Sequence, residues 1–298
     1  MKQLDPIRHG SFSIERVYRA SPARAFAAWA DPELKARWFA GPSDRWTPVK
    51  RELDFREGGS ELAHGSFKGG PESIFVARYH SIVPDQRLVY SYEMTVGGKQ
   101  LSVSVATVEF SPTREGGTRM IFTEQVAFLN GDYDVKSRED GTHGLLDNFA
   151  GVVEDPHELV TARLFAQPRE RVFAAFSDPK QLARWWGPNG FSNTVQAFDL
   201  RPGGAFRLNM RGPDGTSYPN VWRFSEVAAP ERVVCEHVEP GHQFTLSLQF
   251  VELASETLLV WRMRFAERAE AERVRELVER ANEENLDRLA QHLNASGV

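Results

Sequence analysis

The stretch RVYRASPARAFAAWADPELKARWF, residues 16–39, recurs as RLFAQPRERVFAAFSDPKQLARWW at residues 163–186. The two segments align without a gap at an offset of 147 residues, and ten of their 24 positions are identical. Shorter paired motifs continue the repeat: Gly-Gly at 58–59 and 203–204, and Leu-Asp at 146–147 and 286–287. A repeat this long can bury its own core, so it indicates a duplicated domain rather than a solenoid unit. We predict one domain over residues 1–154 and a second over residues 155–298.

Each copy has the same predicted order of elements. A strand opens the copy, and two short helices follow, separated by an Asp-Pro dipeptide that ends one and begins the next. In the first copy Ser21 is a suitable N-cap and Pro22 a good first helical residue. Five or six strands of alternating polarity follow, and an amphipathic helix closes the copy. The opening strands are predicted at 12–20 and 158–166, and the closing helices at 135–153 and 269–292.

The closing helix decides the predicted architecture. An antiparallel sheet with one apolar face needs a cover, and this helix is the only predicted element long enough to supply it. Such a sheet curls around the helix and encloses space between them. The predicted fold class is therefore α+β, with two tandem domains. Each is a curved antiparallel sheet wrapped around a long C-terminal helix, with two short helices after the first strand.

The motifs of the second copy carry a family resemblance. They are PRERVFAAF at 168–176, LARWWGP at 182–188 and RPGG at 201–204, with equivalents in the first copy. Together with the element order they resemble the helix-grip (SRPBCC) superfamily, which includes START lipid-transfer domains, the birch-pollen allergen and polyketide cyclases. The branch they resemble most is related to the activator of the ninety-kilodalton heat-shock-protein ATPase. The resemblance covers nearly the whole chain twice, but the superfamily mixes binders with enzymes and so implies no single function.

Composition excludes several classes of protein. The 298 residues carry a net charge of −5, which gives no reason to expect nucleic acid or an anionic membrane as a partner. The single cysteine, Cys235, excludes an intramolecular disulfide, and the eight histidines show no metal-ligand spacing. No apolar run is long enough for a signal peptide or a membrane span. We therefore expect a cytoplasmic globular protein without metal or cofactor.

Strand phase places a carboxylate on the apolar face of the first copy. Glu124 is in phase with Phe122 and takes the position that Met263 occupies in the second copy. A carboxylate there must be paired, hydrogen-bonded or protonated. We interpret Glu124 as a ligand-contacting or acid/base group in a cavity, and it is the candidate catalytic residue. The alternative is a structural partner for an Arg or Tyr near the cavity rim.

The two copies differ around this position. The first copy has small or hydroxylated inward side chains, whereas the second has bulky ones and a histidine that is either a candidate base or a hydrogen-bonded core residue. We therefore predict that the first copy has the roomier and more polar cavity. The predicted ligand-binding residues are Tyr79, Tyr90, Tyr92, Ser104, Phe122, Glu124, Trp222, His237 and Trp261. The recurring Arg37 and Arg184 are interpreted as partners of Asp31 and Asp178 or as helix-end caps rather than as substrate ligands.

Three functions fit these observations. The first is binding of a small hydrophobic or amphipathic molecule between sheet and closing helix, chiefly in the first domain. The second is a polyketide-cyclase-like enzyme, with Glu124, Tyr90 or Tyr92 placed against a substrate carbonyl. The third, implied by the resemblance to the chaperone activator, is a protein-interaction module. An outward stripe of Leu101, Val103 and Val105 would then be its interface, with a homodimer as one form.

Overall fold

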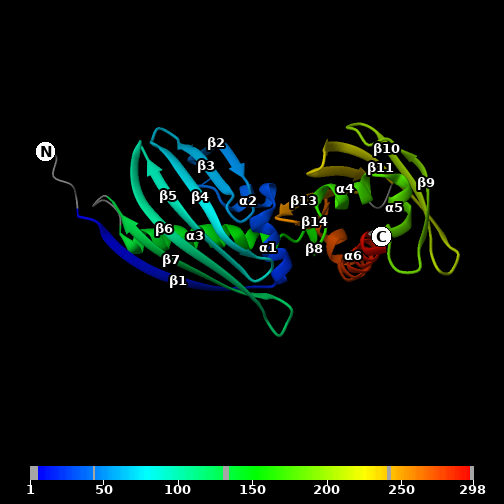
Figure 1. The fold of residues 1–298 in the computed structure, drawn as a ribbon, viewed down its shortest axis with the longest axis horizontal. Coiled ribbons are helices and arrows are strands. Elements are labelled where there is room, and N and C mark those ends of the chain that lie inside the picture. Colours follow the sequence, from blue (N-terminus) through cyan, green and yellow to red (C-terminus); the bar gives the residue numbers. More distant parts are fainter. Residues whose placement is uncertain (1–5, 43, 130–133, 240–242, 296–298) are drawn as a thin grey trace. The chain divides into compact units, whose positions relative to one another are not determined.

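The computed structural model describes residues 6–42, 44–129, 134–239 and 243–295. It separates into two compact units, Met1–Asp155 and Pro156–Val298 (Figure 1). Each unit contains a seven-stranded antiparallel sheet, two short helices after its first strand and a long closing helix. The predicted α+β class and the tandem duplication are therefore confirmed.

The first domain has the strand order β1-β7-β6-β5-β4-β3-β2, so that the opening strand pairs with the last one. Figure 1 shows its closing helix lying across the sheet. The elements are β1 (Arg8–Tyr18), α1 (Pro22–Ala30), α2 (Pro32–Trp38), β2 (Trp46–Leu53), β3 (Ser60–Phe67), β4 (Glu72–Val83), β5 (Arg87–Val96), β6 (Lys99–Pro112), β7 (Thr118–Phe128) and α3 (Val135–Val153).

The second domain repeats this topology with the order β8-β14-β13-β12-β11-β10-β9. Its closing helix is longer than that of the first domain. The elements are β8 (Glu158–Phe165), α4 (Arg169–Ser177), α5 (Pro179–Trp185), β9 (Ser192–Phe198), β10 (Ala205–Arg211), β11 (Ser217–Ala228), β12 (Arg232–His237), β13 (Phe244–Leu253), β14 (Glu256–Phe265) and α6 (Arg268–Ala295).

The Asp-Pro dipeptides start the second short helix of each domain, as predicted. Asp31 Oδ1 accepts hydrogen bonds from the backbone N–H groups of Glu33 at 2.8 Å and Leu34 at 3.0 Å. Asp178 Oδ1 accepts the equivalent bond from Lys180 N at 2.8 Å. These bonds satisfy backbone donors that have no partner inside the first helical turn. The carboxylate and the proline together fix where α2 and α5 begin.

A recurring tryptophan then fastens each pair of short helices. Trp38 Nε1 donates to the carbonyl oxygen of Ala28 at 2.8 Å, and Trp185 Nε1 donates to that of Ala175 at 2.9 Å. Both indoles are fully buried. Because the same hydrogen bond is present in both copies, each of these tryptophans holds its two short helices together.

The recurring Gly-Gly pairs also have a backbone reason. Gly58 and Gly203 have φ values of +78° and +81°, a region that other residues rarely adopt. A Cβ on Gly59 or Gly204 would lie about 2 Å from a backbone carbonyl oxygen, at 2.2 Å and 1.9 Å respectively. The first glycine of each pair is therefore needed for its conformation and the second for close approach of the chain.

Strand phase agrees with the predicted inward faces. β7 buries Met120, Phe122, Glu124 and Val126, whereas the intervening residues are partly or fully exposed. One outward assignment was wrong: Leu101 is buried and lines a cavity, while Val103 and Val105 are exposed. The register between β5 and β6 shifts at Met94 and Thr95, so Leu101 is the extra residue of a bulge and turns to the other face.

The closing helices cover the inward faces. α3 buries Leu146, Phe149 and Val153 and packs against α1, α2 and β1. α6 buries Leu286 and Leu289 and packs against β8 and β14. Over the part of the chain that the structure describes, no helix is long and apolar enough to cross a membrane.

Candidate functional site

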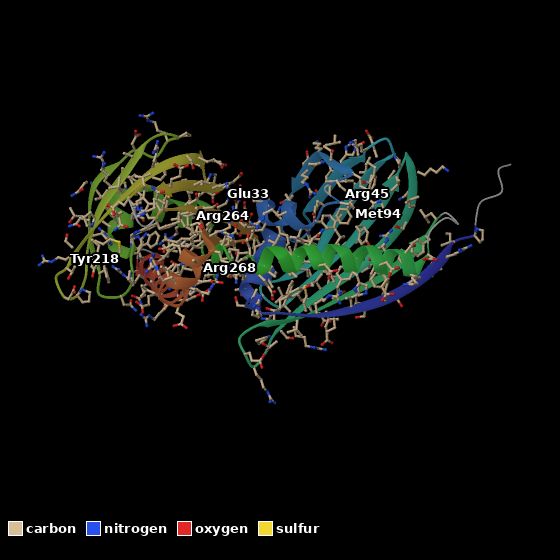
Figure 2. All side chains as sticks on the ribbon, turned by 180° about the vertical axis from the view of Figure 1, so that it is seen from behind. Glu33, Arg45, Met94, Tyr218, Arg264 and Arg268 are labelled. Carbon is tan, nitrogen blue, oxygen red and sulfur yellow. The ribbon has the colours of Figure 1, made fainter. Side chains whose placement is uncertain are left out.

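A cavity of about 530 Å³ lies in the first domain between the sheet and α3. Its walls come from β2 to β7, from the two short helices and from the first half of α3. Met94, labelled in Figure 2, is one of the β5 residues that line it. The lining residues are Trp29, Trp38, Phe39, Ala40, Gly41, Trp46, Ala63, Phe67, Pro71, Ser73, Phe75, Tyr90, Tyr92, Met94, Val96, Leu101, Phe122, Glu124, Ser137, Arg138, Gly141, Thr142, Leu145 and Leu146.

Aromatic rings form most of the wall and support one another. The ring centroids of Trp29 and Trp38 lie 4.7 Å apart, and those of Phe39 and Phe75 lie 4.8 Å apart, both edge to face. Phe75 in turn lies 4.9 Å from Tyr92. Rings held at these distances have favourable quadrupole contacts and little freedom to move. The cavity is therefore bounded by a preformed apolar surface.

One end of the cavity is polar, and Glu124 is its centre. Ser104 Oγ donates to Glu124 Oε1 at 2.8 Å, and Arg138 Nη1 forms an ion pair with the same oxygen at 3.5 Å. Arg138 Nη1 also donates to the Tyr92 hydroxyl at 2.7 Å, and Nη2 donates to Ser102 Oγ at 2.7 Å. The guanidinium thus links α3 to the strands β5, β6 and β7.

The second oxygen of this carboxylate, Oε2, is unpaired among the described residues. Glu124 is 0% exposed, and its Oε2 has no hydrogen-bond partner among the described residues. A buried acceptor without a partner costs about 1–3 kcal/mol, and more when it is charged. A ligand that brings a hydrogen-bond donor to Oε2 would recover this free energy.

The two tyrosines of the wall are held neutral. Burial raises the pKa of Tyr90 well above its ordinary value of 10.0, and the neighbouring Tyr92 and Glu124 raise it further. Burial also raises the pKa of Tyr92, although Arg138 opposes this shift. Both phenols therefore keep their protons at neutral pH, and they are hydrogen-bond donors rather than bases.

Tyr79 does not line the cavity, contrary to the prediction. Its hydroxyl donates to Glu61 Oε2 at 2.6 Å, and Lys35 Nζ pairs with the same oxygen at 3.3 Å. The Lys35 ammonium lies 4.1 Å from the Trp29 ring centroid and 4.9 Å from that of Trp38. Since both indoles line the cavity, this buried ion pair lies behind its wall. Burial lowers the pKa of Lys35, and Glu61 opposes that shift.

The structure brings together five of the six residues predicted in the first domain. Four of them, Tyr90, Tyr92, Phe122 and Glu124, line the cavity. Ser104 lies outside the lining and reaches the site through its bond to Glu124. Tyr79 lies on the inward face, as predicted, but its partner was not predicted. Strand phase shows which face a side chain lies on and does not show which groups it contacts there.

The three residues predicted in the second domain belong to a packed core. Trp222 and Trp261 are members of its cluster of buried apolar side chains. His237 lies between Trp222, at 4.6 Å, and Phe244, at 5.1 Å between ring centroids. Trp261 packs against Trp186 at 5.0 Å. These side chains fill the second core, and the ligand role predicted for them has no support in this arrangement.

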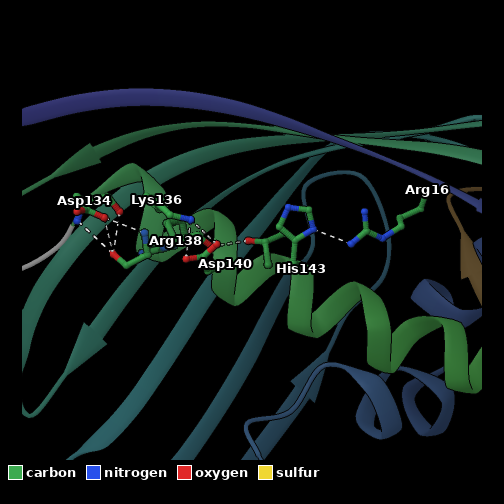
Figure 3. Close-up of polar contacts among 8 residues, drawn as sticks. Arg16, Asp134, Lys136, Arg138, Asp140 and His143 are labelled. Carbon is green, nitrogen blue, oxygen red and sulfur yellow. Dashed lines mark hydrogen bonds and ion pairs between the residues drawn. The ribbon is translucent and has the colours of Figure 1, made fainter.

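Arg138 is the main residue that the sequence analysis missed. Helical spacing offers the signal, because Arg138 lies on the same face of α3 as Thr142 and the buried Leu146. Figure 3 shows the polar contacts that hold this half of the helix. Lys136 Nζ forms an ion pair with Asp140 at 3.1 Å, and Thr142 Oγ1 donates a hydrogen bond to the carbonyl oxygen of Arg138. A hydrogen bond of 2.6 Å joins Arg16 Nη2 of β1 to His143 Nδ1 of the helix.

One comparison with known proteins identifies a family. The model of the family described as Activator of Hsp90 ATPase homolog 1-like protein matches residues 19–154 and 166–294. No curated protein matches the chain.

Several solved structures are similar to half of the chain. An uncharacterised protein from Rhizobium leguminosarum is 41% identical, with a TM-score of 0.48, over 50% of this chain and 97% of its own. A protein from Rhizobium loti is 42% identical, with a TM-score of 0.46, over 50% and 99%. A protein from Nitrosomonas europaea is 22% identical, with a TM-score of 0.44, over 47% and 96%.

Proposed function

The chain belongs to the family of Activator of Hsp90 ATPase homolog 1-like proteins, and on that premise we propose that its first domain binds a small, largely apolar molecule. The binding site is the cavity between the sheet and α3. One observation carries the proposal: an aromatic cavity that ends on a buried carboxylate whose second oxygen has no hydrogen-bond partner in the described part of the chain.

The size and the lining of the cavity support this function. Ligand pockets in proteins are typically about 300–1,000 Å³, with apolar walls and a few polar groups that orient the ligand. The cavity of about 530 Å³ lies within that range, and its polar groups gather around Glu124 and Arg138. Aromatic walls favour a ligand with a ring or a compact hydrocarbon skeleton.

The polar end narrows the chemistry of the ligand. Glu124 Oε1 is already bonded to Ser104, and the Arg138 nitrogens are bonded to Tyr92 and Ser102. Tyr90 and Tyr92 can still donate their hydroxyl hydrogens, and the acceptor that has no partner among the described residues is Glu124 Oε2. The ligand therefore carries a hydroxyl or amine hydrogen at its inner end, such as a phenol, an alicyclic alcohol or an aromatic amine.

Native mass spectrometry of freshly purified protein is the first experiment, because it detects any ligand that is retained from the cell. A titration with 2-naphthol and naphthalene, followed by the fluorescence of the cavity tryptophans, then tests the chemistry. We expect saturable quenching by both probes and tighter binding of 2-naphthol. Glu124→Met, which introduces the residue of the second domain, should remove the preference and leave naphthalene binding nearly unchanged.

Two variants serve as controls. Gly141 lines the cavity, and no atom of the residues that the structure describes lies within 4 Å of a Cβ built on it. Gly141→Leu should therefore narrow the cavity without a clash and weaken the binding of both probes at least tenfold. Trp222→Phe alters the second core and should leave the first domain's affinity unchanged. Binding that Gly141→Leu does not weaken would contradict the proposed site.

A polyketide-cyclase-like enzyme stays a second candidate because Glu124 presents a carboxylate to the cavity. A general base must lie within hydrogen-bond reach of the proton that it removes. Once mass spectrometry has identified a retained molecule, that molecule can be incubated with the wild type and with Glu124→Gln. Loss of product with retained binding would support catalysis, and unchanged turnover would remove Glu124 from the mechanism.

A further inference from the structure

Two arginines recur on the short helices of both domains. Arg24 of α1 corresponds to Arg171 of α4, and Arg37 of α2 corresponds to Arg184 of α5, at the common offset of 147 residues. In both domains the pair lies at the end of the closing helix rather than on the inward face of the sheet. Recurrence in both copies makes their surroundings directly comparable.

In the first domain both arginines contact Asp155, Arg37 at its carboxylate and Arg24 at its backbone carbonyl. Arg37 Nη2 forms an ion pair with Asp155 Oδ2 at 2.7 Å, and Arg24 Nη2 donates to the Asp155 carbonyl oxygen at 3.3 Å. Asp155 follows the last turn of α3. The neighbouring positions Leu34 and Val152 are apolar and buried. In the first domain, the Asp155 carboxylate and the apolar side chains of Leu34 and Val152 therefore occupy the positions around the two arginines.

In the second domain all three of these fillers are exchanged. The offset of 140 residues that relates the closing helices puts Ala295 at the position of Asp155 and His292 at that of Val152. Gln181 stands at the position of Leu34. The arginine pair, Gln181 and His292 line a recess of about 400 Å³. The carboxylate has been lost, and polar groups have replaced the apolar ones.

The recess has an excess of positive charge. Arg171 Nη2 donates to the carbonyl oxygen of Leu293 at 2.9 Å, which holds the guanidinium against α6. Among the described residues no acidic side chain forms an ion pair with Arg171 or Arg184. Asp178 is the acid that faces His292, and its Oδ1 caps the first turn of α5. Burial lowers the pKa of His292, and the two arginines lower it further, whereas Asp178 opposes them.

We propose that this recess at the end of α6 is a binding site for a small carboxylate, distinct from the cavity of the first domain. Two planar guanidinium groups match the geometry of a carboxylate. Gln181 and His292 form the polar wall beside them, with Gln181 Oε1 and His292 Nε2 hydrogen-bonded to each other at 3.2 Å and Gln181 Nε2 donating to Asp178 Oδ2 at 3.3 Å. The ligand takes the place that the Asp155 side chain fills in the first domain. This site does not depend on what the first domain binds.

NMR titration of the full chain with succinate and acetate tests the proposal, with chloride at equal ionic strength as the reference and inorganic phosphate as a competing anion. Succinate should shift the His292 ring signals saturably. It should also raise the pKa of His292, because the bound negative charge opposes the two arginines. By linkage, succinate should bind more tightly as the pH falls through the pKa of His292.

Arg184→Gln should weaken succinate binding at least tenfold, and Arg171→Gln should act in the same way. Arg207→Gln, which removes the same charge from an exposed position on β10, should leave the affinity unchanged. A response no larger than that of chloride, or one that Arg184→Gln does not weaken, would overturn the proposal.

Discussion

At the scale of single residues, Glu124 and Arg138 set the first domain apart from the second. The equivalent positions carry Met263 and Val278, so the pair of charges is replaced by a pair of apolar side chains. Met263 is buried within the core cluster of the second domain. The two domains thus show the same inward site in a polar form and in an apolar form.

Removing Arg138 alone should be costly. Arg138→Val leaves the fully buried Glu124 carboxylate without its cation, and breaking a buried pair in this way destabilises proteins by about 3 kcal/mol or more. The double variant Glu124→Met/Arg138→Val reproduces the second domain and should recover more than half of that loss. Urea unfolding measures both values. A double variant that is less stable than Arg138→Val would contradict the interpretation.

At the scale of elements, a buried ion pair joins α2 to the sheet. Lys35 of α2 reaches Glu61 of β3, which also accepts a hydrogen bond from Tyr79 of β4. The second domain makes the same junction with three apolar side chains, Leu182, Phe206 and Phe224, all fully buried. A charged and polar junction in the first domain and an apolar junction in the second therefore hold equivalent short helices on equivalent sheets.

This comparison predicts the effect of exchanging the junction. Lys35→Leu should destabilise the first domain by about 3–5 kcal/mol, because it leaves Glu61 buried without a cation. The triple variant Lys35→Leu/Glu61→Phe/Tyr79→Phe carries the apolar set of the second domain. Thermal unfolding should show that it is more stable than the single variant, since no charge is left buried. A triple variant that falls below the single one would show that the two junctions are not equivalent.

At the scale of the whole molecule, the tyrosines are divided unequally between the domains. Of the six in the chain, Tyr218 is the one that belongs to the second domain, and it is partly exposed. Burial raises the pKa of four tyrosines in the first domain above the ordinary value of 10.0: Tyr18, Tyr79, Tyr90 and Tyr92. The two domains should therefore respond differently to alkali.

The first domain should unfold at a lower alkaline pH than the second. Because the pKa of each buried tyrosine is raised in the folded state, the tyrosine ionises first in the unfolded chain. Its contribution to the free energy of unfolding is complete below pH 10 and falls by about 1.4 kcal/mol per pH unit above it. Lys35, with its lowered pKa, acts in the opposite sense but is a single group. Buried Cys235, whose pKa is also raised, is the corresponding group of the second domain.

Separately expressed fragments, residues 1–155 and 156–298, allow the two transitions to be compared, since each unit has its own sheet and core. Circular dichroism between pH 8 and pH 11.5 follows the loss of structure. Tyr90→Phe removes one ionising group and should move the transition of the first fragment to higher pH. Equal transitions in the two fragments would contradict the assignment to the buried tyrosines.

The sequence by itself determined the duplication, the element order and the inward faces of the strands, because these depend on local spacing and periodicity. It also placed Glu124 on an apolar face. Only the tertiary structure decided which groups meet. It joined Arg138 to Glu124, turned Tyr79 toward Glu61 and put Leu101 in the cavity wall through a bulge. Residues distant in sequence meet only when strand register and helix placement are fixed, and periodicity along one element contains neither.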